Sequence, residues 1–146
     1  MADDERVASG DRHDAIRLTH EAHRTIGVQI EELASSPDLE TTARRLASFA
    51  DVLEAHFADE EAPDGLFDVL RFKRPEMHRR LKFLQEDHRR MMQALGVLRA
   101  AAGDDSWSFS RMQREVASFL YQLRRHERAE GRLIADVYYL DEGGTG

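Results

Sequence analysis

Hydrophobic residues recur at every third or fourth position along four segments of the chain, a spacing that places them on one face of an α-helix. In the second segment, for example, Leu46, Phe49 and Leu53 follow this rhythm. The segments cover residues 11–35, 36–62, 75–103 and 110–140. The pattern therefore predicts four helices joined by mostly short connections.

Residues that favour helix starts stand at the beginning of each segment. Asp11, Ser36 and Ser110 are predicted N-caps, because their side-chain oxygens can accept a bond from a free backbone N–H of the first turn. Pro37 and Pro75 suit the first turn of a helix, where a missing N–H costs nothing. A short apolar run at 66–70 is predicted as a connection between the second and third helices.

These elements predict an all-α fold, an antiparallel up-down four-helix bundle. The chain has 146 residues, the usual size of one domain, with only three prolines. We predict one bundle over residues 11–140, a disordered tail at 1–10 and a flexible tail at 141–146.

Composition removes several classes of function. The chain has no cysteine, which excludes disulfides, zinc–thiolate sites, iron–sulfur clusters and a cysteine nucleophile. The net charge of −7 and the absence of a dominant basic patch predict no nucleic-acid partner. No apolar run has the length of a membrane span, and the N-terminus does not read as a signal peptide. We expect a cytoplasmic protein that does not bind membranes.

The two halves of the chain repeat one arrangement of histidine and glutamate. Residues 47–60 and 117–130 share six identities in fourteen positions, among them His56 with His126 and Glu60 with Glu130. Residues 21–24 and 86–89 also match, each with a histidine between a glutamate and an arginine. Each half thus carries one histidine, a gap of 33 or 38 residues, and then His-x-x-x-Glu. The repeat predicts an internal two-fold relation between two helix pairs.

This spacing is suited to binding metal. An His-x-x-x-Glu step puts both side chains on one helix face, with Cβ atoms roughly 5–6 Å apart. Two such helices present two imidazoles and two carboxylates to a shared interior, and nitrogen and oxygen ligands without thiolate suit iron or manganese. The predicted ligands of a two-metal centre are His23, His56, Glu60, His88, His126 and Glu130. A set of buried histidines and glutamates that bind only one another would gain nothing over an apolar core.

The chain resembles the hemerythrin-like family, also called the HHE cation-binding domain, from about Arg12 to Tyr139. The resemblance rests on His23 and on the segments HFADE at 56–60, QEDH at 85–88 and HERAE at 126–130. It implies an antiparallel four-helix bundle around two iron ions joined by an oxo or hydroxo bridge, which bind or react with oxygen. By the same resemblance, Glu60 and Glu130 bridge the irons.

Two features depart from the oxygen-carrying members. These have a longer His-to-Asp step on the fourth helix, where this chain has His126 to Glu130, and a His-x-x-x-His pair on the third helix. Here the second place of that pair is Met92, and the matching place on the first helix is Gly27. A thioether is a poor ligand for oxidised iron. Glu127 and His20 are both candidates for an additional ligand, and the sequence does not choose between them.

Three functions fit this ligand set. The first is reversible binding of O2 or another diatomic such as NO, for carriage or sensing. The second is catalysis, either peroxide consumption or iron oxidation. The third is an iron-responsive regulatory module, although no protein partner is indicated. The missing fifth histidine favours reaction with O2, peroxide or NO over simple carriage, because it leaves both irons open to added ligands.

Overall fold

The computed structural model describes the backbone of residues 2–143 and the side chains of residues 14–138. Within the described residues the chain is helical and has no strand. Five α-helices and one 3-10 turn follow in the order α1 (Ala2–Ala34), α2 (Leu39–Glu61), α3 (Leu66–Lys73), η1 (Pro75–Met77), α4 (His78–Gly103) and α5 (Phe109–Gly143). The predicted all-α class is therefore confirmed.

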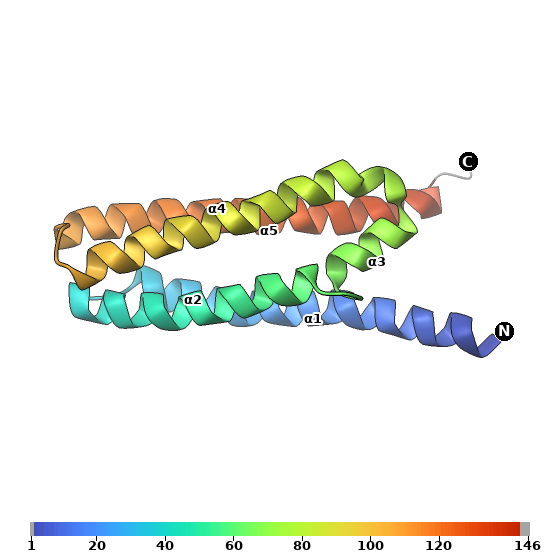
Figure 1. The fold of residues 1–146 in the computed structure, drawn as a ribbon, viewed down its shortest axis with the longest axis horizontal. Coiled ribbons are helices and arrows are strands. Elements are labelled where there is room, and N and C mark those ends of the chain that lie inside the picture. The colour runs from blue at the N-terminus through green and yellow to red at the C-terminus, as the bar shows by residue number, and fades with distance from the viewer. Residues whose placement is uncertain (1, 144–146) are drawn as a thin grey trace.

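Four long helices form the bundle, and the short α3 connects its two halves (Figure 1). Helix α1 packs against α2 and α5, and α4 packs against α2 and α5. The α1–α2 and α4–α5 loops lie at the same end of the molecule, at the left of Figure 1, whereas α3 lies toward the opposite end. The α1–α2 pair and the α4–α5 pair therefore pack against each other along their length.

The hydrophobic core is divided into two clusters. The larger cluster includes Ile26, Leu53, Met91 and Leu123, and lies toward the two interhelical loops. The smaller cluster consists of buried residues on α3, α4 and α5, namely Leu66, Phe67, Leu70, Leu81, Leu84, Leu133, Ile134 and Val137. Along α4 and α5, the predicted metal ligands fall between residues of one cluster and residues of the other. The bundle thus encloses a polar layer between two apolar ones.

Two predicted N-caps differ from those observed, and Pro75 opens the 3-10 turn η1 while α4 itself begins at His78. Asp38 caps α2 in place of Ser36, since its Oδ1 accepts a hydrogen bond from the N–H of Thr41 at 2.7 Å. Ser108 occupies the corresponding place before α5 in place of Ser110, and its Oγ accepts from the N–H of Arg111 at 3.1 Å. Both loops contain more than one residue of a type that caps helices, so the sequence alone does not identify which of them is the N-cap.

The first helix is longer than predicted: α1 begins at Ala2, whereas the prediction started it after Asp11. No proline precedes Pro37, so nothing in residues 2–10 forces the helix to start later. The predicted flexible tail at 141–146 lies partly within α5, which continues to Gly143, and its residues 144–146 fall outside the described residues. Whether either end lies outside the folded domain stays a prediction.

The connection at 66–70 was not predicted as helical, yet it forms most of α3. Eight residues are too few to show a helical period in sequence. Gly65 starts this helix from a position where a Cβ would lie 2.3 Å from the carbonyl oxygen of Asp59 and 2.9 Å from that of Glu60. Only glycine fits there without displacing the end of α2, which carries a predicted ligand.

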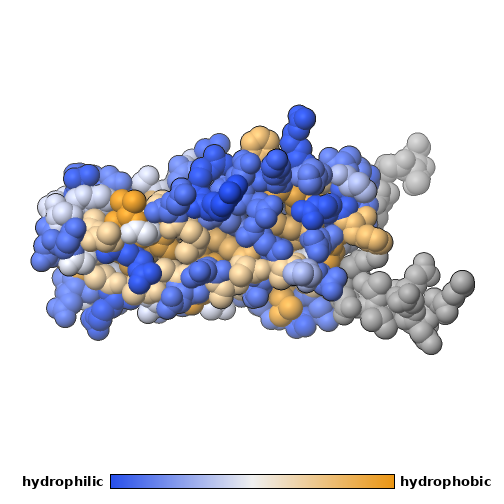
Figure 2. All heavy atoms as spheres, viewed as in Figure 1, coloured by the Kyte–Doolittle hydropathy of each residue, from blue (hydrophilic) through white to orange (hydrophobic). Residues whose placement is uncertain are grey.

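Hydrophilic residues cover most of the face shown in Figure 2, with apolar residues along its middle. Among the described residues, none of the helices contains a stretch both long enough and apolar enough to cross a bilayer.

Gly65→Ala is expected to destabilise the protein by about 1–3 kcal/mol, because the added methyl group overlaps the backbone of α2. Gly96→Ala is the matched control: a Cβ there meets nothing within 4 Å, and alanine in a helix should stabilise by about 0.5–1 kcal/mol. Urea unfolding of both variants measures the difference. Equal effects of the two substitutions would contradict the close approach at Gly65.

Candidate metal centre

The six predicted ligands meet in the polar layer between the two hydrophobic clusters. All four long helices contribute: His23 from α1, His56 and Glu60 from α2, His88 from α4, and His126 and Glu130 from α5. Five of them are buried, and His23 keeps 19% of its side chain exposed. The structure therefore brings together all six residues that the repeat singled out.

Their ligand atoms form two groups, each compact enough to hold one cation. Within each group the nitrogen and oxygen atoms lie within 4.8 Å of one another. The first group is His23, His56, Glu60 and Glu130, and the second is Glu60, His88, His126 and Glu130. Both groups contain the same two carboxylates, so Glu60 and Glu130 lie where they can contact two ions at once.

Contacts between the two halves of the chain occur in matched pairs. His23 Nε2 lies 3.2 Å from Glu130 Oε1, and its counterpart His88 Nε2 lies 3.5 Å from Glu60 Oε1. In each case a lone histidine faces the glutamate of the opposite half. Both imidazoles thus direct Nε2 toward the shared carboxylates.

Contacts within each His-x-x-x-Glu helix are matched as well. His56 Nε2 lies 3.0 Å from Glu60 Oε1, and His126 Nε2 lies 3.3 Å from Glu130 Oε2. The imidazoles also pair across helices: the ring centroids of His23 and His56 are 5.0 Å apart, and those of His88 and His126 are 4.9 Å apart. The sequence repeat therefore has a geometric counterpart in the site.

The carboxylates of this layer lack hydrogen-bond partners. All four carboxylate oxygens of Glu60 and Glu130 are buried, and none has a hydrogen bond within the described residues, although imidazole nitrogens lie within ion-pair distance. Buried polar atoms in folded proteins are nearly always paired. Oxygens that stay unpaired between histidine nitrogens are the donor set that a cation completes, so these residues fit a metal.

The two glutamates divide their charge unequally. Burial raises the pKa of Glu60 well above its usual range, and the neighbouring Glu130 raises it further. Burial opposes ionisation of Glu130 too, but the surrounding Glu60, His126 and His23 hold its pKa well below the usual range. The two carboxyls are close enough to titrate as a pair, and burial in the metal-free protein disfavours two negative charges side by side.

The histidines are prepared to act as neutral ligands. Burial, together with the charge of a neighbouring histidine, lowers the pKa of His56 to about 4 and that of His88 to about 3. His23 differs, because contact with Glu130 outweighs burial and raises its pKa. At neutral pH, His56 and His88 are therefore uncharged, so metal binding does not have to displace the extra proton of an imidazolium.

Two acidic residues contact the outer nitrogens of the second histidine pair. Asp87 Oδ2 lies 3.3 Å from His126 Nδ1, and Glu61 Oε2 lies 3.4 Å from His88 Nδ1. Glu61 was not among the residues that the sequence singled out. Its contact crosses from α2 to α4, so it depends on how the helices are aligned, which spacing along one helix does not reveal.

Aromatic side chains surround His88. The Phe57 ring stacks on the His88 ring with centroids 3.8 Å apart and planes 9° from parallel. Phe67 stacks at 5.3 Å. One phenylalanine belongs to each hydrophobic cluster, so the two clusters meet at this imidazole.

The additional candidates occupy different surroundings. His20 is exposed and belongs to neither ligand group. Glu127 is half-buried, and its Oε1 has no hydrogen bond within the described residues. Burial raises the pKa of its carboxyl, although the nearby His23 lowers it in part. Met92 lines a cavity of about 390 Å³ together with Phe57 and His88. A Cβ at Gly27 would meet nothing within 4 Å, so space remains on the opposite side.

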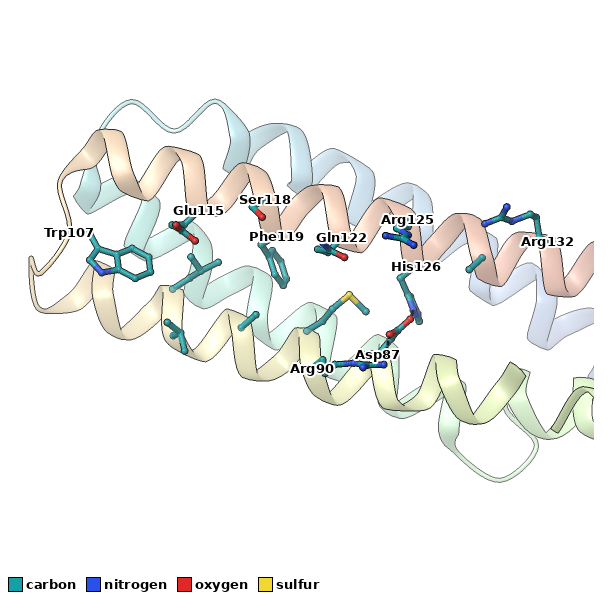
Figure 3. A pocket seen from close by; sticks show the side chains of 15 residues that line it. Asp87, Arg90, Trp107, Glu115, Ser118, Phe119, Gln122, Arg125, His126 and Arg132 are labelled. Atoms are coloured by element: carbon teal, nitrogen blue, oxygen red, sulfur yellow. Dashed lines mark hydrogen bonds and ion pairs between the residues drawn. The ribbon is translucent and has the colours of Figure 1, made fainter. Parts of the chain in front are cut away.

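A larger cavity of about 810 Å³ lies between α4 and α5 and extends from Trp107 to His126. Figure 3 shows Asp87 and His126 on its wall, on facing helices and directed toward one another. His126 and its partner Asp87 therefore border this cavity.

Comparison with known families agrees with this geometry. Residues 11–137 match the family model described as the hemerythrin HHE cation binding domain. The chain belongs to this family. No characterised protein and no solved structure gives a match. Membership implies cation binding, and the two His/Glu groups are the residues that could hold the metal in this HHE domain.

Because the carboxylates are unpaired without metal, Glu60→Leu is expected to stabilise the metal-free protein by about 1–4 kcal/mol. Glu54→Leu is the matched control on the same helix; Glu54 is exposed, so its replacement should change stability by about 0.5 kcal/mol or less. Urea unfolding after chelation measures both. Destabilisation by Glu60→Leu would show that the carboxylate is paired in the metal-free layer.

Proposed function

We propose that this chain is a non-haem di-iron protein that reacts with O2, peroxide or NO, and that peroxide consumption is its main activity. In this proposal the bundle is antiparallel with an internal two-fold repeat. One ion is held by His23 and His56 and the other by His88 and His126, with Glu60 and Glu130 shared. The observation that carries the proposal is the pair of ligand groups with two common, unpaired carboxylates.

A bound iron pair would supply redox chemistry to a small oxygen species. Disproportionation of two hydrogen peroxide molecules to two water molecules and one O2 would return the irons to their starting state without an outside reductant. The protein's own residues set the conditions. Glu60 and Glu130 would offset the charge of two cations in a buried layer, and any proton that the pair holds would leave when metal binds. The hydrophobic clusters on both sides limit access to water. Glu127 is proposed as a further ligand or proton carrier. Its Oε1 has no hydrogen bond within the described residues, and its carboxyl lies close enough to His23 for their charges to interact.

Reversible O2 carriage is the alternative, and two positions argue against it. The oxygen-carrying members of the family have a histidine where this chain has Met92, and Gly27 adds no ligand at the matching place. Four histidines for two ions leave more positions for exogenous ligands than five do. Such a site favours reaction over storage. A cytoplasmic location is part of the proposal and fits a chain without cysteine.

The purified protein is expected to contain two irons per chain and to show near-ultraviolet absorption from a ferric pair. Chelation should lower the melting temperature, since a metal that binds only the folded state stabilises it. Glu130→Ala should lose metal, with no further fall in melting temperature on chelation. Metal analysis and thermal melts test this. One metal per chain, manganese or zinc alone after growth with ample iron, or identical melts with and without metal would contradict a di-iron centre.

Peroxide consumption should exceed that of an equal amount of free iron, and any oxygen adduct should be short-lived. Met92→His restores the residue found in oxygen carriers and is expected to lengthen the life of the adduct and reduce peroxide turnover. Met92→Leu, which keeps an apolar side chain of similar size, is the control and should behave like the parent. A long-lived oxygen adduct in the parent, with no peroxide consumption above free iron, would favour the carrier.

A further inference from the structure

The two halves of the site are alike in their ligands but differ in what lies behind them. The Nδ1 atom of His126 is hydrogen-bonded to Asp87 at 3.3 Å, whereas the Nδ1 atom of His88 has no hydrogen bond within the described residues and lies within ion-pair distance of Glu61, at 3.4 Å. Within the described residues, no carboxylate lies within 4 Å of Nδ1 in His23 or His56. Only one histidine pair therefore has acidic groups at its outer nitrogens.

The sequence repeat locates the cause of this difference. The alignment that pairs Glu60 with Glu130 places Gly131 opposite Glu61. The alignment that pairs His23 with His88 places Ala22 opposite Asp87. In the first histidine pair, Gly131 stands where a carboxylate would face His23, and Ala22 stands where one would face His56. Neither residue has a side chain that can accept a hydrogen bond.

Two further pairs of equivalent positions strengthen the difference. Arg90 contacts Asp87 at 3.0 Å and so fixes the carboxylate that faces His126, whereas its equivalent in the first half is Thr25. Phe57 stacks on His88, whereas its equivalent beside His23 is Glu127. The second histidine pair is therefore held in place on more sides than the first.

Exposure follows the same division. His88 is 2% exposed and His126 4%, whereas 19% of the His23 side chain is exposed and Gly27 leaves space nearby. His23 is therefore the most exposed of the four histidine ligands proposed here.

An outer carboxylate on a ligating histidine has a known effect. It accepts the Nδ1–H, keeps Nε2 free for the metal and makes the imidazole a stronger donor, and its loss typically weakens metal binding about 10–100-fold. The effect applies to each ion separately, because each histidine contacts one ion.

We propose that Glu61 and Asp87 are positioning residues that make the two metal sites unequal: the ion held by His88 and His126 binds first and tightly, and the ion held by His23 and His56 binds second and exchanges. This inference rests on the proposed two-metal site and adds an order of binding to it. Iron supply would then decide whether the chain carries one ion or two.

Calorimetric titration of the metal-free protein with Co²⁺ tests the proposal, with the visible spectrum of Co²⁺ recorded at each step. The parent should show two steps with different dissociation constants. Asp87→Asn and Glu61→Gln should each raise the tighter constant about 10–100-fold, leave the weaker one nearly unchanged and alter the spectrum of the first step. Asp87→Glu, which keeps the carboxylate, should recover most of the affinity.

The reciprocal change in the other half keeps the test independent of folding defects. Ala22→Asp should tighten the weaker step, and Ala22→Asn is its neutral control. Metal-free urea unfolding confirms that each variant is folded. Two equal steps in the parent, or outer substitutions that weaken both steps alike, would overturn the inference while leaving the two-metal site intact. Fewer than two Co²⁺ ions bound by the parent would overturn the proposed function itself.

Discussion

Two unpaired carboxylates buried at the centre of the bundle constrain the rest of the structure. Glu60 and Glu130 stand between two hydrophobic clusters, with four imidazoles around them, and their carboxylate oxygens have no hydrogen bond among the residues that the structure describes. Without a cation, this layer opposes folding, because buried charge and unpaired polar atoms both cost free energy. The apolar clusters must therefore hold the helices in place around a layer that is unfavourable by itself.

The clusters meet this requirement by enclosing the layer from both ends. Phe57 and Phe67, one from each cluster, stack on His88, so the apolar packing also orients a ligand. Gly65 permits the chain to turn directly after α2, and α3 then supplies residues of the smaller cluster. Fold and site are thus interdependent: the turn that completes the core also fixes the end of the helix that carries Glu60.

The main features of the site could be predicted from sequence because they depend on spacing within single helices. His56 and Glu60 must share a helix face, and the repeat shows that His126 and Glu130 do the same. Contacts between helices could not be predicted in this way. Glu61 reaches His88 only through the alignment of α2 with α4, and the choice of Asp38 over Ser36 as a cap depends on where the turn before α2 ends. Helix α3 was missed because eight residues are too short to display a period.

The central claim is that one polar layer holds two cations through shared carboxylates. Anomalous X-ray diffraction at the iron absorption edge, from crystals of the iron-loaded protein, tests it most directly. The account predicts two anomalous peaks in the layer, one beside His23 and His56 and one beside His88 and His126, with Glu60 and Glu130 contacting both. A single peak, or no peak with the glutamates hydrogen-bonded to the histidines, would contradict it.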